Sequence, residues 1–154
     1  MSVFITQFGS ALFSGWNLTS FAAYSSCVLF TQVSGAMYYG TVFGTTFMKL
    51  AYPNIKTEED KKRLLQDFNP TLAYGSAFGG AAVVFWLLKT LFHVFQVSSA
   101  IDGASIALLI VAIDTAFGIM HPFFEDRPFK LYLLHRGYHA WCLGIGGAVL
   151  GAFL

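Results

Sequence analysis

The residues best able to do chemistry in this chain are a few ionisable side chains within long apolar segments. His135 and His139 are four positions apart, so a helix would carry them on one face, together with Tyr132 and Cys142. Imidazoles at this spacing can bind a metal, relay a proton, or hydrogen-bond at a helix interface. Local spacing fixes no HExxH pattern and no third ligand, so hydrogen bonding is the favoured interpretation and no metal is predicted. The sequence leaves any cofactor unknown.

The elements that hold these histidines are predicted to be membrane-spanning helices. The chain has 154 residues with 56% hydrophobic and 11% charged, and no charged residue precedes Lys49. Soluble domains carry about a quarter charged residues. The formal net charge of +1 gives no basic stripe, which excludes nucleic-acid binding. The two cysteines, Cys27 and Cys142, lie in apolar segments and are expected to be buried thiols.

A spanning helix needs about 20 mostly apolar residues, and four segments meet this requirement. We predict an all-α integral membrane four-helix bundle that forms a single domain over residues 1–154, with an interfacial N-terminal segment. A short surface helix is expected over 58–65, begun by a capping box of Thr57 and Asp60. The predicted spans are residues 18–48, 70–95, 100–120 and 129–152. The first is long, so it should tilt or bend near Gly35, Gly40 and Gly44.

The orientation follows from the lysines and arginines, which concentrate in two of the connections. The connection after the first span holds five of them, and the connection before the fourth holds Arg127 and Lys130. Both connections should therefore face the cytoplasm or an equivalent inner compartment. Both termini are predicted on the opposite side, which also holds the sequon at Asn17. The sequon lies against the membrane, where the transferase would reach it poorly, so glycosylation is not the favoured interpretation.

The predicted spans bring polar groups from three helices to one depth. A rise of about 1.5 Å per residue places Asp114 and Gln32 roughly 21 Å from the outer surface of a core about 30 Å thick. The same rise puts His135 and His139 roughly 9 and 15 Å above the inner surface. A lone carboxylate there would cost several kcal/mol, so we expect Asp114 to face the interior. It should lie within direct or water-bridged hydrogen-bond reach of His135 or His139, and Gln32 can join the group. The candidate catalytic residues are Asp114, His135 and His139, and the candidate ligand-binding residues are Gln32, Tyr39, Tyr132 and Tyr138.

Pairs of glycines four residues apart occur in three spans, at Gly40 and Gly44, Gly75 and Gly79, and Gly147 and Gly151. Such pairs let helices approach closely within one chain, or between copies. Near the outer surface, Lys89, His93, Gln96 and Asp102 form a second polar group. We interpret it as a structural charge cluster, with Lys89 reaching outward to water, or as a site of ligand entry.

Two stretches resemble a family of small membrane proteins known as domain of unknown function 1761. Residues 35–48, GAMYYGTVFGTTFM, resemble its Trp-Tyr-Ser-Pro, Phe-Gly and Trp-Met signature, although Tyr38, Thr41 and Phe47 stand where the family has Trp, Pro and Trp. Residues 127–139, RPFKLYLLHRGYH, resemble its Arg-Pro and Gly-Tyr-His segment. The resemblance runs from about residue 17 to the C-terminus. It implies a four-helix integral membrane protein, assigns no activity, and places His139 in the shared framework while His135 is particular to this chain.

The sequence allows three functions. The favoured one is a binding or assembly component whose partners are membrane lipid, a hydrophobic small molecule, a second copy or another membrane subunit. The second is a membrane-embedded enzyme that acts on a hydrophobic small molecule with His139 and Asp114. The third is a small proton-coupled transporter that uses Asp114. A cavity that reaches Asp114 and His139 would favour the last two.

Overall fold

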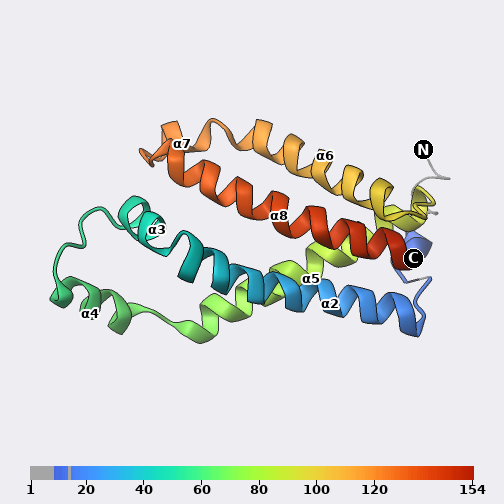
Figure 1. The fold of residues 1–154 in the computed structure, drawn as a ribbon, viewed down its shortest axis with the longest axis horizontal. Coiled ribbons are helices and arrows are strands. Elements are labelled where there is room, and N and C mark those ends of the chain that lie inside the picture. The colour runs from blue at the N-terminus through green and yellow to red at the C-terminus, as the bar shows by residue number, and fades with distance from the viewer. Residues whose placement is uncertain (1–8, 14) are drawn as a thin grey trace.

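The computed structural model describes residues 9–13 and 15–154, and the described residues form helices without strands (Figure 1). The predicted all-α class is therefore correct. The described helices are α2 (Leu18–Met37), the π-helical segment η1 (Tyr38–Val42), α3 (Gly44–Ala51), α4 (Glu58–Asp67), α5 (Pro70–Val94), α6 (Ala100–Gly118), α7 (His121–Phe124) and α8 (Phe129–Phe153). Most of the predicted interfacial segment, residues 1–8 and 14, lies outside the described residues.

Helix starts follow the capping chemistry in the sequence. Asn17, Asn69 and Ser99 each accept a hydrogen bond from a backbone N–H in the first turn of the helix that follows. Thr57 and Asp60 form the predicted capping box of α4. The hydrogen bonds that the Asp60 carboxylate accepts from Thr57 hold its pKa below the usual value. The side-chain oxygen of Asn17 accepts from the Ser20 N–H at 2.8 Å, so this amide serves as a helix cap.

The long first segment bends as expected, and the bend has a defined form. α2 passes into the π-helical turn η1, and α3 begins after Phe43. π-helical turns inside longer helices are frequent at functional sites. Here the turn presents Tyr38 and Tyr39 to α8, where both contact the ring of Tyr138.

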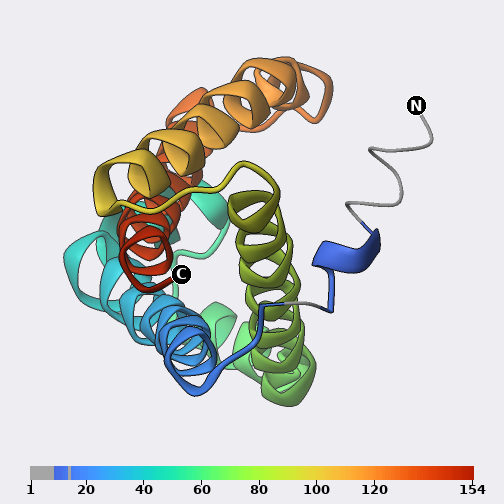
Figure 2. The same ribbon diagram turned by 90° about the vertical axis from the view of Figure 1, so that its right-hand side faces the viewer.

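α8 lies at the centre of the fold, because both α6 and α2 pack along it, while α5 packs mainly on α2 (Figures 1 and 2). The α6–α8 contact is a close approach of two backbones. A Cβ added at Gly103 would collide with the Gly147 carbonyl, and one at Gly151 would meet the Ser99 carbonyl and the Gly103 backbone. Small residues allow this contact, which stabilises helix pairs through dispersion.

The glycine pairs divide into two classes. Gly147 and Gly151 pack against α6 as predicted, but a Cβ at Gly40, Gly75 or Gly79 would meet nothing within 4 Å. The prediction that these three glycines face a neighbouring helix is wrong. Spacing alone identifies a stripe of small residues on a helix, but it does not determine which way the stripe points. The partner of Gly147 on α6 is a Gly–Ala pair, Gly103 and Ala107.

The interior is densely packed at the end of the molecule that holds both the α5–α6 turn and the C-terminus. The fully buried side chains of α5, Phe85, Leu88, Lys89, Thr90 and Phe92, all lie in its second half. Of these, Phe85, Leu88 and Phe92 pack with Cys27 and Val28 of α2 and Leu150 of α8. Leu72, Tyr74 and Phe78 in the first half of α5 remain about half or more exposed. The fold is therefore closed at one end and open at the other.

Lys89 does not reach outward to solvent as predicted. Its side chain is 0% exposed, and its ammonium lies 4.5 Å from the centre of the Trp16 ring. A cation over an indole face is stabilised by the ring quadrupole, which lets this lysine stay inside. The segment before α2 covers it: Trp86 donates to the Leu12 carbonyl at 3.0 Å, and Phe13 packs on Trp86. Asp102 instead accepts a hydrogen bond from the Ser99 hydroxyl at 2.7 Å.

Two helical segments of the described chain are long and apolar enough to cross a membrane. They are Pro70–Val94 and Ala100–Phe124, which continues α6 through α7. α7, after His121, was not predicted. α2 and α8 have the length of spans, but α2 carries more serine and threonine side chains, and α8 carries Lys130 and Arg136.

The two classes of glycine should respond differently to enlargement. Gly147→Leu should lower the stability by about 1–3 kcal/mol, because the added side chain overpacks a backbone contact. Gly79→Leu should leave it within about 0.5 kcal/mol, because the site is open. Thermal unfolding in detergent measures both. Equal melting temperatures for the two variants would contradict this packing.

Candidate functional site

The ionisable groups of α6 and α8 meet around the carboxylate of Asp114. Its Oδ2 accepts a hydrogen bond from Arg136 Nη1 in an ion pair, and His139 Nδ1 lies 3.9 Å from the same oxygen. The Arg136 side chain is 19% exposed, whereas those of Asp114 and His139 are 55% and 47% exposed. The predicted proximity of Asp114 and His139 is thus observed, but Asp114 does not face a closed interior.

Arg136 is the partner that the sequence analysis did not identify. Its guanidinium also lies 4.9 Å from the centre of the Tyr132 ring, and its tip fills the space beside Gly118. A carboxylate deep in a membrane needs a positively charged partner, and this need pointed to an arginine or lysine on a facing helix. Several cations lie near this part of the sequence, including Arg127 and Lys130. The antiparallel register of α6 and α8 decides that Arg136 is the one level with Asp114.

His135 faces η1 and α3 rather than α6. Its Nδ1 is 2.7 Å from the hydroxyl of Tyr39, and its ring lies beside those of Tyr39 and Phe47. The two histidines therefore have separate partners, although they share one helix face. Within the described chain, no three His, Cys, Asp or Glu side chains are grouped to hold a metal ion.

Three tyrosine hydroxyls join helices through main-chain carbonyls. Tyr138 donates to the Thr31 carbonyl at 2.7 Å and Tyr38 donates to the Leu134 carbonyl at 3.1 Å, so α8 and the α2–η1 segment are linked in both directions. Tyr132 donates to the Thr115 carbonyl of α6. Of the predicted ligand-binding tyrosines, Tyr132 and Tyr138 thus use their hydroxyls within the fold, and the Tyr39 hydroxyl pairs with His135.

Glycines make room for two of these links. A Cβ at Gly35 would lie 2.8 Å from the Tyr138 hydroxyl, and one at Gly137 would lie 2.9 Å from the Tyr38 hydroxyl. Both distances are shorter than real Cβ contacts, so these positions require glycine if the tyrosines are to reach across. Gly35 and Gly137 thus belong to the polar contact between α2 and α8.

Gln32 of α2 links a fourth helix, α5, to this group of polar side chains. Its side-chain nitrogen donates to the Ala77 carbonyl of α5 at 3.4 Å, and its neighbour Thr31 bonds Tyr138, which adjoins His139. The predicted layer of polar groups is therefore formed by α2, α5, α6 and α8 together.

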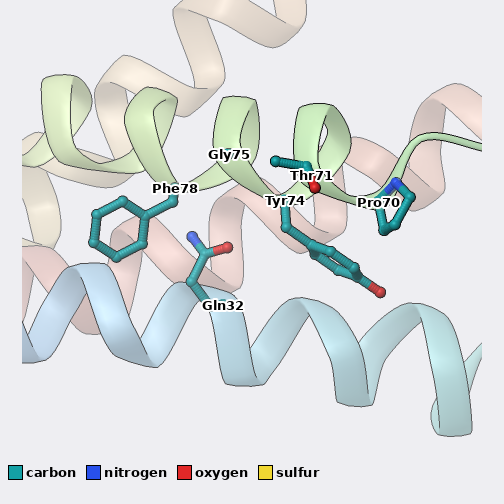
Figure 3. A pocket seen from close by; sticks show the side chains of 6 residues that line it. All are labelled: Gln32, Pro70, Thr71, Tyr74, Gly75 and Phe78. Atoms are coloured by element: carbon teal, nitrogen blue, oxygen red, sulfur yellow. The ribbon is translucent and has the colours of Figure 1, made fainter.

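A groove opens beside Gln32 where the first half of α5 separates from the core. It has a volume of about 610 Å³ and is lined by Gln32, Pro70, Thr71, Tyr74, Gly75 and Phe78 (Figure 3). Gln32 points from α2 toward α5 between Phe78 and Tyr74 (Figure 3). The walls are mostly apolar, and the amide of Gln32 and the hydroxyls of Thr71 and Tyr74 supply the polar groups. A second pocket of about 90 Å³, near α7, is lined by residues that include His121, Glu125, Arg127 and His135.

The structure thus defines an all-helical protein with two helices suited to a membrane and one polar layer beside an apolar groove. The family model described as a protein of unknown function (DUF1761) matches residues 22–151, and the chain belongs to that family. The resemblance noted in the sequence is therefore correct. No curated protein and no solved structure matches the chain.

The Asp114–Arg136 pair should show a measurable coupling energy. In a double-mutant cycle of Asp114→Asn and Arg136→Gln, we expect a coupling of at least about 0.5 kcal/mol in detergent unfolding, because the two groups are in direct contact. The cycle of Asp114→Asn and His139→Asn should give a smaller value, because those atoms are 3.9 Å apart. Additive effects in the first cycle would show that the pair does not stabilise the fold.

Proposed function

We propose that the chain is a multi-pass integral membrane protein with four spans, a short inner surface helix and both termini on the outer side. The observation that supports the membrane is the exposure of large apolar side chains on every long helix: Leu18, Leu72, Ile101, Phe117 and Leu133 are each at least half exposed. Soluble proteins rarely expose contiguous apolar surface on this scale. α2 and α8 complete the set of spans in this proposal, because no buried polar side-chain atom among the described residues lacks a hydrogen-bond partner.

The proposed orientation has a direct test. Lys62→Cys and Leu154→Cys should react with a membrane-impermeant thiol reagent from opposite sides, with Lys62→Cys reacting from the inside. The parent chain is the control, because Cys27 and Cys142 are 2% and 3% exposed. Reaction of both variants from the same side would overturn the four-span arrangement.

The function that the geometry supports best is binding of an elongated, mostly apolar molecule in the groove between α2 and α5. Ligand sites are usually concave and mainly apolar, with a few placed polar groups and volumes of about 300–1,000 Å³. The groove has this character, and its volume of about 610 Å³ falls in this range. Gln32 is the observation on which the proposal depends. It is the one lining residue that also belongs to the polar layer, and its long hydrogen bond of 3.4 Å to Ala77 can be exchanged for a ligand contact.

The same contacts favour binding over catalysis. The candidate tyrosines donate their hydroxyl protons to main-chain carbonyls or pair with His135, so they serve to hold helices together. Asp114 is neutralised by Arg136 within the fold. An acid or base for chemistry needs a free position toward a substrate, and neither Asp114 nor His139 lines the groove.

Two neighbouring glycines of α5 provide a matched test of the groove. Gly75 lines it, whereas Gly79, one turn further on, does not, and both sites are open. Gly75→Leu should weaken binding of parinaric acid, a fluorescent apolar probe, at least about tenfold, whereas Gly79→Leu should leave it unchanged. Binding is measured by fluorescence titration of the purified protein. The melting temperature of both variants should equal that of the parent. Equal probe affinity in all three proteins would contradict the proposed site.

A further inference from the structure

The side of the α6–α8 pair that carries Asp114 and His139 is incomplete in a single copy. In the proposed membrane placement, on which this inference rests, Asp114 lies roughly 21 Å along α6 from its start at Ala100, inside a hydrocarbon core about 30 Å thick. Half of its carboxylate and nearly half of the His139 imidazole would then face acyl chains. Ionisable groups at such depth almost always face protein or water, so this side must be covered.

The chemistry of the side indicates what covers it. It presents an acid and a base next to each other, because His139 Nδ1 lies 3.9 Å from Asp114 Oδ2. Two copies inserted with the same topology are related by a two-fold axis along the membrane normal, so equal residues stay at equal depth. Asp114 of one copy is then level with His139 of the other, and two such contacts form by symmetry. The side is complementary to itself in charge.

The apolar surroundings fit a helix contact. Phe117 follows Asp114 by three residues, so the two side chains are neighbours on α6, and Phe117 is 82% exposed. Phe117 therefore projects beside the acid, one turn nearer the inner surface. We infer that the side of α6 and α8 that carries Asp114, His139 and Phe117 packs against the same side of a second copy of this chain.

Cysteine cross-linking in membranes tests this dimer. Phe117→Cys is the probe, and Leu133→Cys is the control. By the register that pairs Asp114 with Arg136, Leu133 is level with Phe117. It lies six residues before His139, about 120° away around α8, and its side chain is 50% exposed. A short bis-maleimide should join Phe117→Cys into a product of twice the 16.9 kDa chain mass, at least about tenfold more than Leu133→Cys. The yield should persist when the protein is diluted with lipid, and adding Asp114→Asn should reduce it several-fold.

Each other outcome overturns the dimer. Equal yields for both cysteines would indicate random collision, and products of a different mass would indicate another subunit. Labelling of His139→Cys by a water-soluble thiol reagent would indicate an aqueous cavity that covers this side. A single-chain mass for the purified parent by light scattering would exclude a stable pair. If the dimer fails while Lys62→Cys and Leu154→Cys react from opposite sides, the membrane placement still stands.

Discussion

The close approach of α6 and α8 is the constraint on which the rest of the structure depends. Gly103 and Gly147 bring the two backbones into contact, and this contact sets the register of an antiparallel pair. Eleven residues further along α6 stands Asp114, and eleven residues back along α8 stands Arg136, with which it pairs. Further toward the same ends, Gly118 makes room for Arg136 and Tyr132. A bulky residue at the first contact would displace the ion pair as well as the helices.

The second feature is the contrast between the two halves of α5. In the second half, Phe85 fills the space beside Gly146, and Phe92 is fully buried, so the helices are held by packing. In the first half the contact to α2 is one long hydrogen bond from Gln32, and the groove opens beside it. A helix fixed at one end and lightly held at the other can admit a molecule of variable shape without disturbing the core.

The sequence predicted the elements well, because their signals are local. Asn69 with Pro70, Ser99 with Asp102, and Thr57 with Asp60 begin helices where expected. The expected bend of the first segment is present because the chain forms a π-helical turn at Tyr38. The sequence also predicted that polar groups from separate helices come together, and Asp114 and His139 do so at 3.9 Å. Their shared depth in a membrane stays a prediction.

What the sequence could not supply is the direction in which each helix face points. Gly75 and Gly147 have the same four-residue motif, yet one faces open space and the other a backbone. Lys89 was expected in water because lysine usually extends there, but Trp16, brought over α5 by the chain before α2, encloses it. Arg136 was overlooked for the same reason, because its role depends on the α6–α8 register. The polar layer depends on both local spacing and tertiary packing. Helix rise sets the position of each polar residue along its helix. Tertiary packing determines that the carboxylate pairs with an arginine and that the tyrosines bond main-chain carbonyls. Because those carbonyls belong to the helices themselves, the hydrogen bonds of the layer hold the helices in their register.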